Sequence, residues 1–116
     1  MENTRASLLT LVPSAAQTSS GIGSAVEVGE YIQLLVTLNI TAMSGTSPSV
    51  EVYLETSDDD GTTWYTLPNG NFTSATSVGQ QVMQITAPFG NYLRAVYTLG
   101  GTTPSVTFAV KAVAKG

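Results

Sequence analysis

Few residues in this sequence could carry catalytic chemistry, because it contains no histidine and no cysteine. Their absence excludes a Ser-His-Asp triad, a Cys-His pair and the usual zinc ligand sets. Two carboxylates could still hydrolyse a glycoside, and Glu51 and Glu55 are the pair to consider. On one strand, a spacing of four residues separates them by about 13 Å, too far for either hydrolytic geometry. We therefore expect a solvated strand face here and a protein that is not an enzyme.

The acidic run Asp58-Asp59-Asp60 could offer oxygen ligands to calcium. It lacks the further ligands and the distant bidentate glutamate of a calcium loop, so we predict no metal ion and no cofactor. The surrounding stretch is similar to the Asp-box, a hairpin turn that recurs in sialidase propellers, and matches its S-x-D-x-G-x-T-W pattern at Ser57, Asp59, Gly61, Thr63 and Trp64. The resemblance implies that the Asp59 side chain binds backbone amides of the turn and that Trp64 packs beneath. A propeller would need several copies, so this single copy indicates a structural turn.

Aromatic side chains could instead form a platform on which sugar rings stack. The candidates are Tyr31, Tyr53, Trp64, Tyr65, Tyr92 and Tyr97. Because aromatic residues of β proteins mostly serve the core or its rim, this carbohydrate-binding hypothesis is the alternative to a structural one.

The elements that must position these residues are predicted to be strands, since apolar residues recur with a period of two. Residues 31–43 are apolar at every even position, namely Ile32, Leu34, Val36, Leu38, Ile40 and Ala42. After a loop at 44–49, the alternation resumes at Val50, Val52 and Leu54, which predicts a central antiparallel hairpin over 31–57.

Further strands are predicted over 6–16, 25–28, 64–67, 81–86, 92–99 and 105–114, with turns at 17–24, 57–64, 68–71, 88–91 and 100–104. Pro13 predicts an edge position or a bulge in the first of them, because proline cannot donate to a ladder. Residues 72–78 fit either a loop or a weak strand. No helix is predicted. The fold class is therefore all-β, an antiparallel sandwich or jelly roll of seven to nine strands, with a closed barrel as the alternative.

One six-residue pattern occurs twice, as GTSPSV at 45–50 and GTTPSV at 101–106. Each copy follows one alternating strand and precedes another, which predicts two similar hairpin turns with glycine at positive φ and proline at the strand start. If both loops lie at one end of the sandwich, Thr46, Pro48, Thr102 and Pro104 are candidate contacts with another protein.

The composition limits the kinds of molecule that the chain is expected to bind. Charged residues make up only 10% of the chain, whereas 17 Thr and 12 Ser supply much of its polar surface. Such a neutral surface suits burial under another protein, because few charges need desolvation. A net charge of −4 with four basic residues argues against nucleic acid. No stretch is long and apolar enough to predict a membrane span.

The 116 residues are predicted to form a single domain, 1–116, in which 1–14 is an N-terminal strand or arm. Its apolar run is broken by Thr10 and ended by Pro13, which argues against a secretory signal. Leu8, Leu9 and Leu11 are candidate inter-subunit contacts.

Taken together, the QTSSGIGSAVEVG segment, the long apolar strand, the SGTSPSVEVYLETSDDDGTTWYTL stretch and the closing APFGNYLRAVYTLGGTTPSVTFAVKAVAKG resemble small β-sandwich structural proteins of tailed bacteriophages. The resemblance implies a head decoration, or cement, protein. Such a protein is made in the host cytoplasm, binds the major capsid protein on the capsid exterior, stabilises the shell and is often a symmetric homo-oligomer. A minor tail protein and a lectin-like carbohydrate-binding module remain the alternatives.

Overall fold

Two strands of unusual length, β4 (Gln33–Ser57) and β7 (Tyr92–Lys115), form the centre of the fold. A computed structural model describes residues 6–86 and 89–115. Within these residues β4 and β7 pair antiparallel from Gln33↔Lys115 to Ser57↔Tyr92, almost end to end. The remaining strands attach to this pair.

Five shorter strands complete one antiparallel sheet, and no described residue is helical. They are β1 (Ala6–Gln17), β2 (Gly21–Ile22), β3 (Val26–Glu27), β5 (Tyr65–Asn71) and β6 (Gly79–Thr86). β1, β2 and β3 pair with β7, whereas β5 and β6 pair with β4. The all-β prediction is confirmed, with seven strands in the described part of the chain. In that part no helix is present that could cross a membrane.

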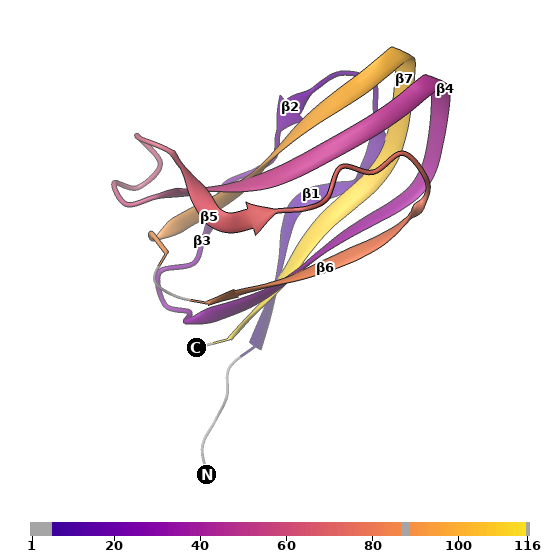
Figure 1. Ribbon diagram of the computed structural model, residues 1–116. Helices are drawn as coiled ribbons and strands as arrows, with labels where there is room; N and C mark the ends of the chain where they lie inside the picture. Colours follow the sequence, from indigo (N-terminus) through magenta and orange to yellow (C-terminus); the bar gives the residue numbers. More distant parts are fainter. Residues whose placement is uncertain (1–5, 87–88, 116) are drawn as a thin grey trace.

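The sheet folds into two layers because β4 and β7 bend together near their middles (Figure 1). One layer contains β1, the second half of β7, the first half of β4, and β6. We call it the four-stranded layer. The other contains β2, β3, the first half of β7, the second half of β4, and β5. We call it the second layer.

The predicted hairpin over 31–57 is wrong, because the two halves of β4 pair with β7 instead of with each other. Neither GTSPSV nor GTTPSV joins two strands that pair with each other. The two copies lie opposite one another at the bend, with Thr46 paired to Thr102, and register shifts occur on both sides of that pair. Local alternation locates strands but does not reveal which distant strand completes a ladder.

Positive φ angles produce the bend. Gly45 has φ 112° and Gly101 has φ 101°, and two residues later Ser47 and Thr103 have φ 51° and 50°. These are left-handed conformations that favour glycine and are uncommon for other residues. The repeat therefore encodes two opposed bulges that turn a strand pair over a corner.

Alternating residues of both layers meet in one core, as the period of two predicts. Val36, Val52, Phe108 and Val110 are all fully buried, and Tyr97 packs edge-on against Phe108 with ring centroids 5.1 Å apart. The even-position prediction is wrong at its two ends. Ile32 precedes β4 and is 57% exposed, and Ala42 is exposed beyond a register shift.

Two of the predicted irregularities can be compared with the structure. Exposed Pro13 lies within a register shift between Val12 and Ala15 in the β1–β7 ladder, so the predicted bulge is confirmed. The predicted turn over 68–71 is instead part of β5, where the ladder with β4 skips from Thr66 to Asn71 and Asn69 has φ 61°. Pro88 of the next predicted turn lies outside the described residues.

Candidate protein-interaction surface

The outward side of the four-stranded layer presents apolar side chains in rows across the strands. Leu8, Val113, Leu35 and Gln84 are successive neighbours across β1, β7, β4 and β6, and Val82 belongs to the next row. Leu8 is 67% exposed, Val82 61% and Leu35 40%. We define the outer face as Leu8, Thr10, Gln33, Leu35, Thr37, Asn39, Gln80, Val82, Gln84, Thr86, Lys111, Val113 and Lys115. It is a partly apolar surface with two lysines and no acidic residue, of the kind that protein partners cover.

Charges are segregated between the layers. The only charged residues in the strand segments of the four-stranded layer are Lys111 and Lys115, both exposed. All described acidic residues lie elsewhere, at Glu27, Glu30, Glu51, Glu55, Asp58, Asp59 and Asp60. The outer face is thus mildly positive on a chain of net charge −4.

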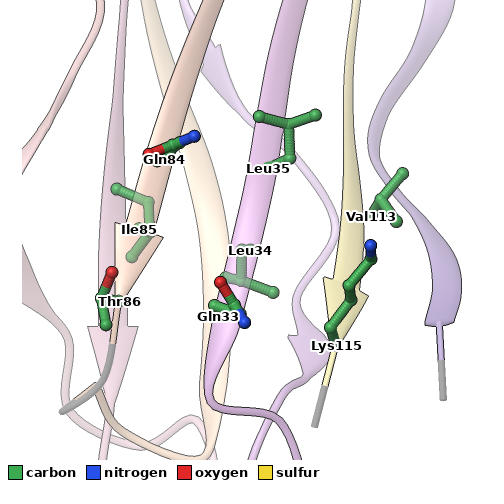
Figure 2. A pocket seen from close by; sticks show the side chains of 8 residues that line it. All are labelled: Gln33, Leu34, Leu35, Gln84, Ile85, Thr86, Val113 and Lys115. Atoms are coloured by element: carbon green, nitrogen blue, oxygen red, sulfur yellow. The ribbon is translucent and has the colours of Figure 1, made fainter. Parts of the chain in front are cut away.

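Figure 2 shows a depression at the end of the outer face away from the bend. It is lined by Gln33, Leu34, Leu35, Gln84, Ile85, Thr86, Val113 and Lys115 from β4, β6 and β7. In the described residues there is no group of three carboxylate, histidine or cysteine side chains placed to hold a metal ion. The lining combines amides, a hydroxyl and aliphatic groups with the amine of Lys115.

The structure separates the three N-terminal leucines that the sequence analysis selected. Leu8 points outward and belongs to the outer face. Leu9 is half-buried and packs against the core. Leu11 is fully buried, so its prediction as an inter-subunit contact is wrong. The bulge after Thr10 keeps both Leu11 and Val12 in the core. Residues 1–5 of the predicted arm lie outside the described part of the chain.

The bend brings the other four candidate contacts together. Thr46 and Thr102 are paired and exposed, and Pro48 and Pro104 beside them are half-buried. Leu8 pairs with Val113, eight residues along β7 from Ser105 at the bend, which corresponds to about 26 Å of strand. The bend and the apolar row through Leu8 are therefore separate regions.

The turn that resembles the Asp-box is built on two side chains. The buried Ser57 hydroxyl accepts a hydrogen bond from Gly61 N at 2.9 Å and donates one to Asp59 Oδ1 at 2.8 Å. Asp59 Oδ1 also accepts from Thr63 N at 2.8 Å. Hydrogen bonds from the Thr63 backbone, and then from the Thr63 and Ser57 side chains, lower the pKa of the Asp59 carboxyl. The carboxylate thus stabilises the backbone of the turn.

Trp64 closes the same turn. Its indole N–H donates to the Gly61 carbonyl at 3.1 Å. The Arg94 guanidinium lies 4.2 Å from the centre of the Trp64 ring and forms an ion pair of 2.7 Å with Glu55. One face of the ring is therefore occupied by Arg94, a cation–π arrangement. Glu55 serves this contact, while Glu51 is exposed and lies opposite Thr98.

The other aromatic candidates have varied surroundings. Tyr97 is in the core, so its prediction as part of a sugar-stacking platform is wrong. Tyr31 donates a hydrogen bond to the Ser7 hydroxyl at 2.9 Å, and Tyr65 is 55% exposed. Trp64 and Tyr97 are thus already engaged within the chain.

Apart from Leu8, the residues of the outer face were not among the sequence-based candidates. Leu35 and Val82 stand at outward positions of strands whose other face is buried, and Val113 does so on β7. Apolar residues at these positions were a signal, but only the register shows that Leu8, Val113 and Leu35 form one row.

Comparisons with known proteins find a solved structure with a similar fold. No protein-family model matches the chain, and no curated protein matches it. Among solved structures, the chain is similar to the SPBc2 prophage-derived protein YomS, with a TM-score of 0.58 and 18% sequence identity. The match covers 100% of this chain and 97% of that chain. At this level of identity the likeness concerns the fold, and this all-β fold is therefore one that a prophage-derived protein also adopts.

Proposed function

We propose that this chain is a structural protein of a bacteriophage particle that binds the outside of the head and stabilises the shell. The observation that carries the proposal is the outer face, where exposed Leu8 and Leu35 and half-buried Val113 form a row without any acidic neighbour in the layer. The fold shared with a prophage-derived protein supports the phage context.

The side chains of the outer face indicate what kind of surface the partner must present. Apolar side chains at the centre and Lys111 and Lys115 beside them fit a surface of the major capsid protein that is apolar and neutral to acidic. Threonine, asparagine and glutamine around them carry no charge that must be desolvated, and their hydroxyls and amides can form hydrogen bonds with the partner. The acidic second layer would then face the solvent.

A shell offers many identical binding sites, so a modest affinity at each site is sufficient to stabilise the whole shell. Each bound copy that bridges two capsid subunits adds a contact that exists only in the assembled shell, and this shifts the equilibrium towards the assembled state. The decoration role therefore needs no catalytic group.

The test is co-sedimentation with undecorated shells of the phage that encodes the chain. We expect stoichiometric binding and a raised melting temperature of the shell. Leu35→Glu and Leu8→Glu place a charge at the centre of the face and should abolish binding, whereas Ile22→Glu, at a similarly exposed residue of the second layer, should not. Binding that is insensitive to both Leu35→Glu and Leu8→Glu would contradict the proposed face, and no binding to shells would contradict the decoration role.

A further inference from the structure

The free edge of β6 is unprotected against pairing with another chain. Among the described strands β6 pairs only with β4, through an uninterrupted ladder from Ile40↔Gly79 to Gln33↔Thr86. Its sequence, GQQVMQIT, contains no proline and no charged residue. An edge strand of this length presents unpaired N–H and C=O groups to any strand that approaches.

The other short strands of the sheet carry features that prevent such pairing. β1 contains Pro13 and two register shifts. β5 contains Pro68 and a register shift. β2 and β3 are two residues long each. β6 alone among the short described strands lacks such a feature, which indicates that another polypeptide strand covers its edge.

The outward residues of β6 point to a second copy as the occupant. Gln80, Val82 and Gln84 read the same in both directions about Val82. In an antiparallel pair with its own copy centred on Val82, valine faces valine and each Gln80 faces a Gln84. A glutamine amide is both donor and acceptor, so both flanking pairs can form hydrogen bonds.

Charge does not oppose this approach. β6 is uncharged, and the strand segments of the four-stranded layer carry no acidic residue, so pairing at β6 places no carboxylate of these strands at the interface. Each outward residue keeps its place on the outer face when the axis is perpendicular to the sheet. The pair of layers would then form one continuous sheet.

We propose that two copies of this chain associate by antiparallel pairing of β6 with β6 about a two-fold axis beside Val82. The interface joins the two four-stranded layers edge to edge and makes one extended outer face. This inference concerns the free chain and is independent of the function proposed above.

Sedimentation velocity over a range of concentrations tests the association in the absence of capsids. The wild-type chain should form a species of twice its 12.1 kDa mass. Val82→Lys puts like charges directly opposite one another and should leave a monomer. The matched control is Ile22→Lys, at a residue 54% exposed on β2, which should still dimerise. A wild-type monomer at every concentration would overturn the proposal.

A cysteine placed at Val82 tests the position of the axis directly, because the chain has no cysteine of its own. Residues directly opposite in an antiparallel pair have Cα atoms about 4.5–5.5 Å apart, within the range of a disulfide. Val82→Cys should therefore yield a covalent dimer on mild oxidation, while Ile22→Cys should form no covalent dimer. A dimer that resists Val82→Lys and does not cross-link through Val82→Cys would refute pairing at β6.

Discussion

The Ser57 hydroxyl and the Asp59 carboxylate organise the turn after β4 by binding backbone N–H groups within it. Asp60 adds a tie to the neighbouring loop, since its Oδ1 accepts a hydrogen bond from the Asn91 amide at 2.7 Å. These single residues fix the end of the strand that carries Glu55 and place Trp64 against Arg94. At this scale, acidic side chains have structural roles.

Asp59→Asn should destabilise the protein in a pH-dependent way. The pKa of Asp59 is lowered in the folded state, so its stabilising effect is present above the unfolded pKa of about 3.9 and is lost as pH falls through the folded value. Thermal melting of the variant and the wild type should differ near pH 7 and converge in strong acid. Asp58→Asn, at the exposed neighbour, is the control; an equal difference at all pH values would contradict the role of the charge.

Phe108→Ala should be among the costly core substitutions. The ring is fully buried and contacts Tyr97, so its removal leaves a cavity and should lower the free energy of unfolding by about 3–5 kcal/mol. Val78→Ala, at a residue 57% exposed, should change it by less than about 0.5 kcal/mol. Urea denaturation measures both, and similar values for the two variants would show that the core is misplaced.

At the scale of elements, the paired bend in β4 and β7 creates the two layers. The two glycines sit in reciprocal positions there. A Cβ on Gly45 would lie 2.6 Å from the Thr103 carbonyl oxygen, and one on Gly101 would lie 2.5 Å from that of Ser47. The backbones thus approach so closely that only glycine fits.

Gly45→Ala and Gly101→Ala should each cost about 1–3 kcal/mol, because each adds a clash to a positive φ. Gly79→Ala is the matched control, since no atom lies within 4 Å of its added Cβ. We expect Gly79→Ala to be neutral or slightly stabilising. If all three variants have the same stability in urea, the bend does not depend on its glycines.

The sequence predicts the strands better than their partners. Alternation over 92–99 and 105–114 places Leu93, Ala95, Phe108 and Val110 correctly in the core, because burial of one face is a local property. The GTSPSV and GTTPSV repeats predict hairpin turns, but glycine and proline occur in bulges as well as in turns. Only the long-range register distinguishes the two, and it also assembles the row of Leu8, Val113 and Leu35.

At the scale of the whole molecule, the two layers differ in charge. The four-stranded layer carries Lys111 and Lys115 with exposed leucine and valine, while the acidic residues lie outside it. In the proposed complex the four-stranded layer would face the shell and the acidic second layer the solvent. High salt should weaken capsid binding only slightly, because two exposed lysines contribute little compared with apolar burial. Co-sedimentation at low and high salt measures this, and complete loss of binding at high salt would point to an electrostatic interface instead.

The most direct test of the central claim is a cryo-electron microscopy map of shells saturated with the chain. We predict density for this fold on the outside of the head, with Leu8, Leu35 and Val113 against the major capsid protein and the turn at Asp58–Asp60 pointing to solvent. A map in which the second layer contacts the shell, or in which the outside of the head carries no such density, would contradict the account.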